Sequence, residues 1–164
     1  LKLQAQTSVF NLSPRIGKDG RSFRLIRFKT MIDTTAPLPT EERLTKVGRF
    51  IRNYSLDDLP NLVNVLTSDM SIVGPRPTEP ERVDLSHPEW QQILTIRPGC
   101  ISYAVLALAS EFNNSSPDRK RKLELDYVAK QSLGYDLQVM RRSIHKLMTS
   151  QGNVKARGKP SIDD

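Results

Sequence analysis

Apolar and polar residues alternate near the start of the chain, on both sides of a strong turn signal. An apolar stretch at 9–12 and a longer one at 23–28 flank the segment 17–20, whose sequence Gly-Lys-Asp-Gly is typical of a tight turn. In the second stretch Phe23 and Leu25 share one face, because side chains point alternately to opposite faces of a strand. The pattern predicts an N-terminal β-hairpin and leaves its register open.

The spacing becomes helical after this hairpin. Apolar residues recur between basic ones over 44–52, which predicts a first helix. Leu59, Leu62, Val63 and Leu66 repeat at helical intervals, and this spacing predicts a second helix that buries its apolar face.

The start of this second helix carries a capping signal. Ser55, followed by Asp58 at the third helical position, forms an acidic variant of the capping box. Pro60 falls beyond the first turn, where proline removes a hydrogen-bond donor and disturbs the helix. We therefore expect a strained helix or one that starts later.

The rest of the pattern completes the predicted fold. It predicts three helices, at 88–96, 118–131 and 133–148. It also predicts a rigid Gly-Pro-Arg-Pro turn at 74–77 and an apolar segment at 101–109 that is ambiguous between strand and helix. We expect an α+β fold, mostly helical with an N-terminal β-hairpin, in a single compact domain over residues 1–150. A polar tail is expected at 151–164.

The last predicted helix has an apolar stripe formed by Leu133, Leu137, Met140, Ile144 and Leu147. Such a stripe most often packs in the core. With basic residues on the other side, it also suits the surface of an anionic membrane. We expect the core interpretation and keep the second as the alternative.

The composition narrows the class of protein. Of the 164 residues, 37% are hydrophobic and 26% charged, a balance that fits one folded domain. A single cysteine excludes an intramolecular disulfide framework, and the two histidines have no metal-ligand spacing. No run of about 18 apolar residues occurs, so we expect no transmembrane helix in these residues. Because the first residue is Leu rather than Met, we interpret the sequence as part of a longer product.

The charge favours an anionic partner. Lysine and arginine number 25 against 18 acidic residues, a formal charge of +7. Nucleic acid, a lipid surface and a phosphorylated substrate all fit such an excess. Aromatic residues make up only 6%, no known nucleic-acid motif occurs, and basic residues are dispersed among acids, so we expect no nucleic acid partner.

Two adjacent acids, Asp57 and Asp58, are the most informative polar feature. Carboxylates in the first turn of a helix are favoured by the free amide groups there, so simple capping explains them. Adjacent helical side chains diverge by about 100°, so the pair can also divide two roles, one as a nucleophile and one as a metal ligand or base. The residues alone leave both interpretations open.

Basic residues near this pair are candidates for binding phosphate. Arg76 lies between two prolines, which restrict the backbone and suit a guanidinium that binds phosphate oxygens in a bidentate manner. Arg27 and Arg52 belong to a basic set upstream of the acid pair. Surface arginines in contact with water remain the alternative for all three. Asp126, three residues after Leu123, can border a buried stripe, although its periodicity favours an exposed acid.

Read in order, these pieces form a recognisable set of motifs. They lie at 17–20, 27–31, 43–52, 55–60, 61–66, 69–77 and 97–99. The set resembles the bacterial sugar transferases, the monotopic polyprenyl-phosphate phosphoglycosyl transferases that start exopolysaccharide and glycan assembly. The resemblance extends over residues 9–148, nearly the whole chain.

The resemblance implies a two-step transfer on the cytoplasmic face of the bacterial inner membrane. An aspartate attacks the sugar-bearing phosphate of a nucleoside diphosphate sugar, usually a UDP-sugar, and releases UMP; a polyprenyl phosphate then accepts the phosphosugar. The nucleophile is implied at Asp57, with Mg²⁺ at Asp57 and Asp58. Phosphate or nucleotide contacts and a supporting acidic role are implied for Arg27, Arg52, Arg76 and Asp126.

Three departures from the family pattern keep a second hypothesis open. Asp58 stands where the family has Glu, and Ser102-Tyr103 replaces the usual Thr-Gly after Pro-Gly. The family's hydrophobic re-entrant helix does not occur in these residues, so a membrane surface as partner is implied by the resemblance alone. The chain is expected to be an active transferase; the alternative is a catalytically impaired homologue that acts as a membrane-associated assembly partner.

Overall fold

The computed structural model describes residues 8–32, 43–53 and 56–157. Strands β1 (Phe10–Ile16) and β2 (Ser22–Phe28) pair antiparallel along their whole length, which confirms the predicted hairpin. A short 3₁₀ turn, η1 (Lys18–Gly20), connects them, with φ of 56° at Asp19 and 75° at Gly20. Glycine adopts this left-handed region without strain and aspartate tolerates it, so these residue types suit the turn.

The predicted helices that follow the hairpin are both present. The first is α2 (Lys46–Asn53), followed by a 3₁₀ turn, η2 (Leu56–Asp58), and then by α3 (Asn61–Leu66). The expected later start is confirmed, because Pro60 occupies the N-cap position of α3 and no longer interrupts a helix. Ser55, the predicted cap, lies outside the described residues.

The prediction that this helix buries its apolar residues is wrong. Leu59, Leu62, Val63 and Leu66 are all exposed, whereas Asn64 is buried. The Asn64 side chain accepts a hydrogen bond from the N–H of Ile26 at 3.1 Å and donates one to the carbonyl oxygen of Arg24 at 2.9 Å. Those groups lie on the edge of β2 that faces away from β1. Because backbone groups at a covered sheet edge need partners, a polar residue is buried here and the leucines face outward.

A short parallel pair connects the two halves of the chain. Strand β3 (Ser71–Val73) pairs with β4 (Gly99–Ile101). The backbones approach so closely that a Cβ atom on Gly99 would lie 2.0 Å from the amide nitrogen of Gly74. The ambiguous segment at 101–109 therefore begins as the end of a strand and continues as helix α5 (Tyr103–Leu108).

The C-terminal half is helical, as predicted. It contains α4 (Pro88–Ile93), α6 (Pro117–Lys130) and α7 (Leu133–Arg157), with two short 3₁₀ turns, η3 (Pro80–Arg82) and η4 (Ala109–Glu111). The last two helices are separated as expected. The final one continues to Arg157, past the predicted end at Met148 and into the segment expected as a polar tail.

The stripe predicted to lie in the core on α7 is mostly exposed. Leu133, Leu137 and Ile144 are exposed by 79%, 55% and 53%, whereas Val139 is 1% exposed. The core interpretation of this stripe is therefore wrong for these three residues. Met140 is half-buried and packs against the cluster that contains Val139 and Tyr127, so the core prediction is confirmed for this residue. The side chain of Leu147 lies outside the described part of the chain.

Tyrosines organise this buried cluster. Tyr127 is fully buried and packs against Tyr103 and Tyr135, with ring centroids 6.5 and 6.0 Å away, and those two rings are also in contact with each other. Its hydroxyl donates to a carboxylate oxygen of Asp136 at 2.6 Å, which satisfies the one polar atom of the ring. The cluster holds α5, α6 and α7 together beside β3.

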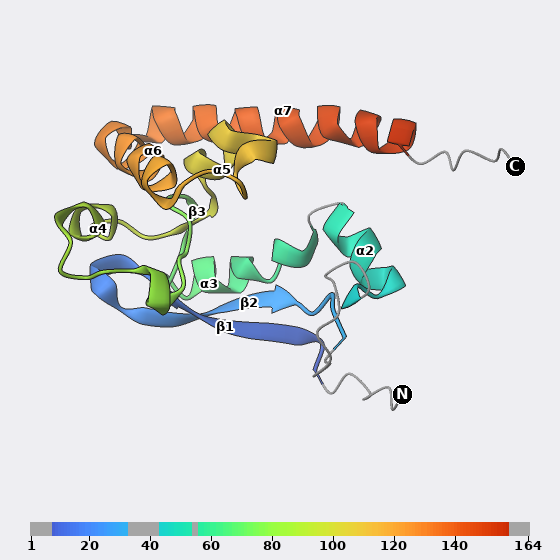
Figure 1. The fold of residues 1–164 in the computed structure, drawn as a ribbon, viewed down its shortest axis with the longest axis horizontal. Coiled ribbons are helices and arrows are strands. Elements are labelled where there is room, and N and C mark those ends of the chain that lie inside the picture. The colour runs from blue at the N-terminus through green and yellow to red at the C-terminus, as the bar shows by residue number, and fades with distance from the viewer. Residues whose placement is uncertain (1–7, 33–42, 54–55, 158–164) are drawn as a thin grey trace, which may run out of the picture.

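The elements form two layers (Figure 1). The hairpin and α3 make one layer, and α5, α6 and α7 make the other, with α4 at the end where the hairpin turns. The Asp19 N–H donates to the carbonyl oxygen of Leu94 at 2.8 Å, which ties the hairpin turn to the end of α4. This confirms the predicted α+β body. Among the described residues, none of the helices combines the length and the apolar character needed to cross a membrane.

Candidate active site

A cavity of about 920 Å³ lies between the two layers. Its walls come from the hairpin, η2, the start of α3, the turn after β3, β4 and the helices above. Three acids line it, Asp58, Glu79 and Glu124, against a larger group of cations. The cations are Arg15, Arg27, Arg76, Arg82, Lys120, Arg121 and Lys146. This excess of positive charge favours an anionic ligand.

The acid pair borders this cavity. Asp58 is exposed and belongs to the lining, whereas Asp57 is half-buried and does not. Burial raises the pKa of Asp57, and the charge of Asp58 raises it further, while Arg52 and Arg27 act in the opposite direction. The two carboxylates therefore have different surroundings, as the interpretation with two separate roles requires.

Arg27 projects from β2 into the cavity, as expected for a phosphate ligand. Its Nε atom is buried and has no hydrogen-bond partner among the described residues. The neighbouring Arg15, which the sequence interpretation missed, is 3.3 Å from the carboxylate of Glu79, and the same carboxylate is 3.0 Å from Arg82. Arg27 thus keeps a donor available for a ligand, while Arg15 and Arg82 are paired.

The backbone of Arg76 is held in place on both sides. Its N–H donates to Oε1 of Glu124 at 3.0 Å, and prolines flank the residue. Its guanidinium carbon lies 5.0 Å from the centre of the Phe112 ring. The side chain keeps contact with solvent in the cavity, yet the surrounding protein still lowers its pKa, first by burial and then through Arg27. A preorganised guanidinium of this kind suits phosphate oxygens.

Arg52 lies near the acid pair but outside the cavity. Its Nε donates to the hydroxyl oxygen of Thr30 at 2.9 Å, and its charge opposes the increase in the pKa of Asp57. The structure therefore brings Arg52 together with the expected nucleophile. It does not place Arg52 among the cavity-lining residues.

The acid that faces the cavity from α6 is Glu124, not the expected Asp126. Asp126 pairs with Lys130 at 2.6 Å and does not line the cavity, so its supporting role stays a prediction. Glu124 is buried, and its Oε1 atom also accepts a hydrogen bond from the Ser102 hydroxyl at 2.8 Å. Burial raises the pKa of this carboxyl to about 7. The signal that sequence analysis missed is the spacing of three to Tyr127, the other buried residue of α6.

Comparison with known sequences identifies the family of this chain. The sequence profile of the bacterial sugar transferases matches residues 1–150. The chain belongs to the bacterial sugar transferase family. The resemblance read from the motifs is thereby confirmed.

Relatives of this sugar transferase include proteins with named activities. The uncharacterized sugar transferase EpsL of Bacillus subtilis is 35% identical over 93% of this chain and 76% of its own length. The UDP-glucose:undecaprenyl-phosphate glucose-1-phosphate transferase of Caulobacter vibrioides is 32% identical, over 92% of this chain and 60% of its own length. The UDP-N-acetylgalactosamine-undecaprenyl-phosphate N-acetylgalactosaminephosphotransferase of Aeromonas hydrophila is 30% identical, over 93% of this chain and 38% of its own length. The chain thus spans about three quarters of the first relative and less than two thirds of the other two.

The acid pair of this sugar transferase offers oxygen ligands. The described residues contain no group of three or more His, Cys, Asp or Glu side chains that could hold a metal by themselves. Mg²⁺ usually takes only one or two carboxylates and completes its shell with water and substrate phosphates. Beside Asp58, the side-chain oxygen of Asn61 is buried and has no hydrogen-bond partner in the described part of the chain, while its amide nitrogen lies 3.3 Å from the Asp58 carboxylate. This donor set fits a small, oxygen-preferring cation.

The residues that replace the family's Thr-Gly have structural partners in this sugar transferase. The Ser102 hydroxyl accepts from the N–H of Val105 at 3.3 Å, so it caps α5, and it donates to Glu124. Tyr103 joins the buried tyrosine cluster through Tyr127 and Tyr135. Ser102 and Tyr103 therefore connect the wall of the cavity to the buried tyrosine cluster.

Proposed function

We propose that this sugar transferase moves a sugar-1-phosphate from a nucleoside diphosphate sugar, most simply a UDP-sugar, to a polyprenyl phosphate such as undecaprenyl phosphate. The reaction is the first step of exopolysaccharide or glycan synthesis, and the enzyme is a transferase of phosphorus-containing groups. Two relatives whose names state this chemistry support the proposal. The main observation behind it is a turn with two carboxylates beside the cavity. Two of the arginines that line this cavity, Arg27 and Arg76, form no ion pair with a carboxylate among the described residues.

The first step forms a covalent aspartyl phosphosugar. A carboxylate oxygen of Asp57 attacks the phosphorus that carries the sugar, and the bond from that phosphorus to the bridging oxygen breaks. The bridging oxygen keeps the electron pair and leaves as part of UMP. Arg27 and Arg76 reduce the negative charge that would otherwise repel the carboxylate. The ionised form of Asp57 is the reactive one, and Arg52 and Arg27 favour it.

The second step regenerates the carboxylate. A phosphate oxygen of the lipid attacks the same phosphorus, and the bond from that phosphorus to Asp57 breaks. The product is a polyprenyl diphosphate sugar. Asp57 and Asp58 would hold Mg²⁺, which supplies further charge neutralisation at the phosphates when bound. Dividing the transfer in two means that two bulky substrates never need to react directly.

A membrane surface is the proposed location, on the cytoplasmic face of the bacterial inner membrane. Leu59, Leu62, Val63 and Leu66 have helical spacing and are exposed by 47–84%. The adjacent α2 contributes exposed Val47 and Phe50 together with three basic and no acidic side chains, a composition suited to anionic lipid. A polyprenyl phosphate is itself embedded in lipid, so a site beside such a face has direct access to it.

Turnover and adduct formation test the proposed function together. The full gene product in nanodiscs is incubated with Mg²⁺ and a panel of UDP-sugars, with and without polyprenyl phosphate. We expect UMP release and a phosphosugar mass on the intact protein that is absent in Asp57→Asn. A folded wild-type protein that gives neither signal with any donor would favour the impaired homologue. In that case Asp58→Glu, which restores the family residue, is expected to recover activity.

A further inference from the structure

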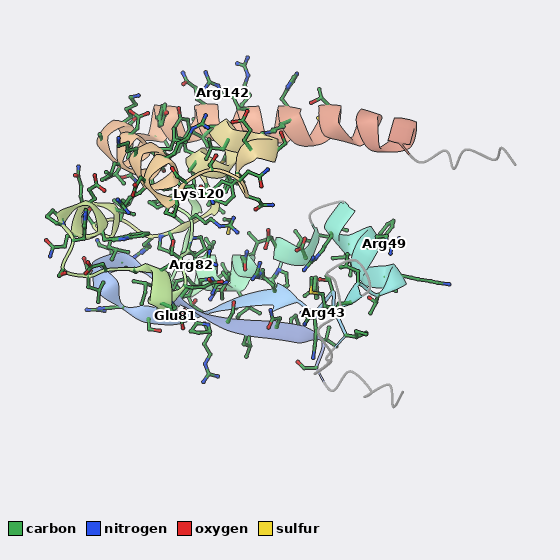
Figure 2. The ribbon with its side chains drawn as sticks, in the orientation of Figure 1. Arg43, Arg49, Glu81, Arg82, Lys120 and Arg142 are labelled. Carbon is green, nitrogen blue, oxygen red and sulfur yellow. The ribbon has the colours of Figure 1, made fainter. Side chains whose placement is uncertain are left out.

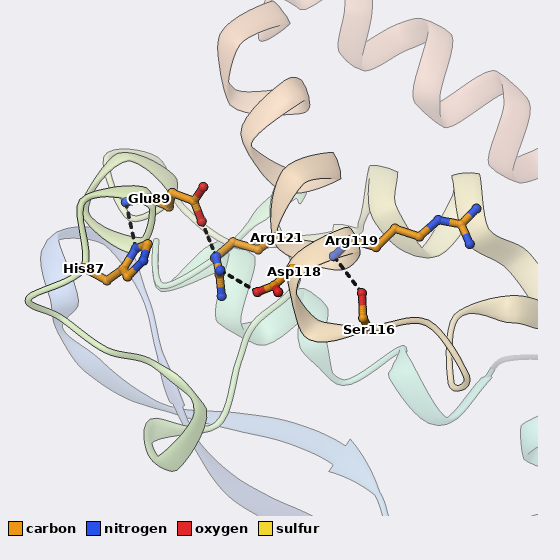
Figure 3. Close-up of polar contacts among 6 residues, drawn as sticks. All are labelled: His87, Glu89, Ser116, Asp118, Arg119 and Arg121. Carbon is orange, nitrogen blue, oxygen red and sulfur yellow. Dashed lines mark hydrogen bonds and ion pairs between the residues drawn. The ribbon is translucent and has the colours of Figure 1, made fainter.

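The first turns of α6 carry four consecutive basic residues that have different surroundings. Arg119 pairs with Glu111 at 3.3 Å. Arg121 bridges Glu89 of α4 and Asp118, the latter at 2.7 Å (Figure 3). Lys122 is exposed and does not belong to the cavity lining. The remaining residue, Lys120, differs from the other three because it both lines the cavity and forms no side-chain ion pair with a described residue.

Lys120 is half-buried and lines the cavity, extending from α6 toward the hairpin layer (Figure 2). Its ammonium group has no ion-pair or hydrogen-bond partner among the described residues and lies against an aromatic ring. Its Nζ atom lies 4.7 Å from the centre of the Phe112 ring. Arg76 lies over the same ring, with its guanidinium carbon 5.0 Å from the centre.

One phenyl ring thus holds two like charges at the wall of the cavity. Cation–π contacts stabilise each charge modestly but neutralise neither. None of the acids in the cavity forms an ion pair with either cation among the described residues: Glu79 pairs with Arg15 and Arg82, and Glu124 accepts hydrogen bonds from the Arg76 backbone and from Ser102. The charges of Asp58, Glu124 and Glu79 only partly offset the lowering of the pKa of Arg76. Both cations therefore keep hydrogen-bond donors for a multivalent oxyanion, which can accept from an ammonium and a guanidinium together.

The position of Lys120 on its helix strengthens this argument. Glu124 follows it by one helical turn and lines the same cavity. One face of α6 therefore supplies both the carboxylate that fixes the Arg76 backbone and a cation that contacts the same Phe112 ring as the Arg76 side chain. Lysine binds phosphate as a point charge, whereas arginine supplies a planar fork, so the two residues complement each other on one phosphate group.

We infer that Lys120 binds a phosphate oxygen of a substrate together with Arg76, and that Phe112 is the positioning residue that holds both cations. This inference rests on the proposed function and deepens it, because it adds a binding residue at the same site. The phosphate can be that of the nucleoside diphosphate sugar or that of the lipid acceptor. The chemistry is the same, and the kinetics distinguish the two.

The test compares Lys120→Ala with Lys120→Arg, and with Lys122→Ala as the matched control. Lys122→Ala removes the same charge from the same helix at a position outside the cavity. KM is measured separately for the UDP-sugar and for the polyprenyl phosphate in the full protein in nanodiscs. We expect Lys120→Ala to raise one of the two KM values about tenfold to hundredfold, as loss of a charge-assisted hydrogen bond predicts. In the same variant kcat should stay within about threefold of the wild-type value.

The identity of the affected KM decides the source of the phosphate. Lys120→Arg should recover most of the loss, and Phe112→Leu, which keeps apolar volume but removes the ring, should give a smaller rise in the same KM. Unchanged KM values in Lys120→Ala, an equal effect in Lys122→Ala, or a fall in kcat alone would overturn the inference.

Equilibrium binding separates this inference from the proposed function. UDP and polyprenyl phosphate are titrated into wild type and Lys120→Ala by calorimetry, which needs no turnover. Weaker binding of either ligand by Lys120→Ala supports the inference even in a chain that transfers no sugar. Wild-type turnover with unaltered binding in the variant overturns the inference alone. Wild-type protein that binds neither ligand overturns both.

Discussion

Helices α3 and α6 both border the cavity and both bury a polar residue, yet their amphipathic patterns are opposite. α3 turns Asn61 and Asn64 toward the protein and exposes Leu62, Val63 and Leu66. α6 buries Glu124 with Tyr127 and exposes four of its eight charged residues. The buried asparagine serves the backbone of β2, whereas the buried glutamate serves the loop that carries Arg76.

The difference separates two functions within one site. On the side of η2 and α3, the acid pair borders the cavity while an apolar surface faces outward, so the proposed chemistry lies beside the proposed lipid contact. On the α6 side, aromatic packing and buried hydrogen bonds hold the phosphate-binding cations in place. The amphipathic pattern of a helix predicts which face packs against the core only where the opposite face is in contact with water.

The largest expected effect is on the η2 side. Asp57→Asn should lower turnover at least about a thousandfold, because an amide cannot replace a nucleophilic carboxylate. The fold should survive, since Asp57 is half-buried and its carboxylate makes no side-chain hydrogen bond to any other described residue. UMP release measures the loss, and circular dichroism checks the fold.

Glu124→Gln on the α6 side is the matched comparison for activity. The amide oxygen can still accept hydrogen bonds from the Arg76 N–H and the Ser102 hydroxyl, so the loop should keep its shape. Turnover is expected to fall by about tenfold or less. If Glu124→Gln abolished turnover as completely as Asp57→Asn, the assignment of chemistry to one side and support to the other would be wrong.

A second prediction concerns α3, which buries its asparagines and exposes its leucines. Asn64→Ala removes the partner of two covered backbone groups of β2 and should lower the free energy of unfolding by about 2–4 kcal/mol. Leu66→Ala, at a side chain that is 84% exposed, should change it by at most about 0.5 kcal/mol. Urea unfolding of both variants measures the contrast. A larger loss in Leu66→Ala would mean that the apolar face packs against the protein after all.

How far the sequence predicts this structure depends on which interactions are local. The hairpin turn and the start of α3 after Pro60 follow from backbone preferences of single residues, and both were predicted. The burial of Asn64 was not, because its partners on β2 are 38 and 40 residues away and no periodicity reveals them. The core prediction for the α7 stripe fails at Leu133, Leu137 and Ile144 for a similar reason, since periodicity identifies an apolar face but not what covers it.

Prediction of the candidate site from the sequence is limited in the same way, because contacts between distant residues are not visible in the sequence. Asp57, Asp58, Arg27 and Arg76 were expected from the motifs, and the structure gathers them around or beside one cavity. Lys120 belongs to a run of four basic residues, and only its tertiary contacts separate it from its neighbours.

The third prediction uses the pH dependence of stability. The carboxyl of Glu124 has a pKa of about 7 in the folded protein, above its ordinary value of 4.5. The folded state therefore keeps this proton more strongly than the unfolded state does. The contribution is fully present below about pH 4.5, falls as the pH rises through about 7, and is lost above it, by up to about 3 kcal/mol in all.

Glu124→Gln removes this titration and should flatten the decline in the free energy of unfolding between pH 5 and about 8. Urea unfolding at several pH values in that window measures the slope for both proteins. Asp126→Asn is the control on the same helix, since Asp126 is paired at the surface with Lys130. A slope that persists in Glu124→Gln would place the responsible group elsewhere.

The smallest expected effect tests the outward face of α3. Leu66→Ser should weaken binding to vesicles that contain anionic lipid by about threefold to tenfold, because one exposed leucine no longer enters the interface. Leu137→Ser makes the same change at another exposed leucine, on α7 in the opposite layer, and is the matched control. Vesicle co-sedimentation with the full protein measures both variants, and neither should lose stability. Weaker binding by Leu137→Ser alone would move the lipid contact from α3 to α7. The orientation of α3 would then follow from the hydrogen bonds of its buried asparagines and not from contact between its leucines and lipid.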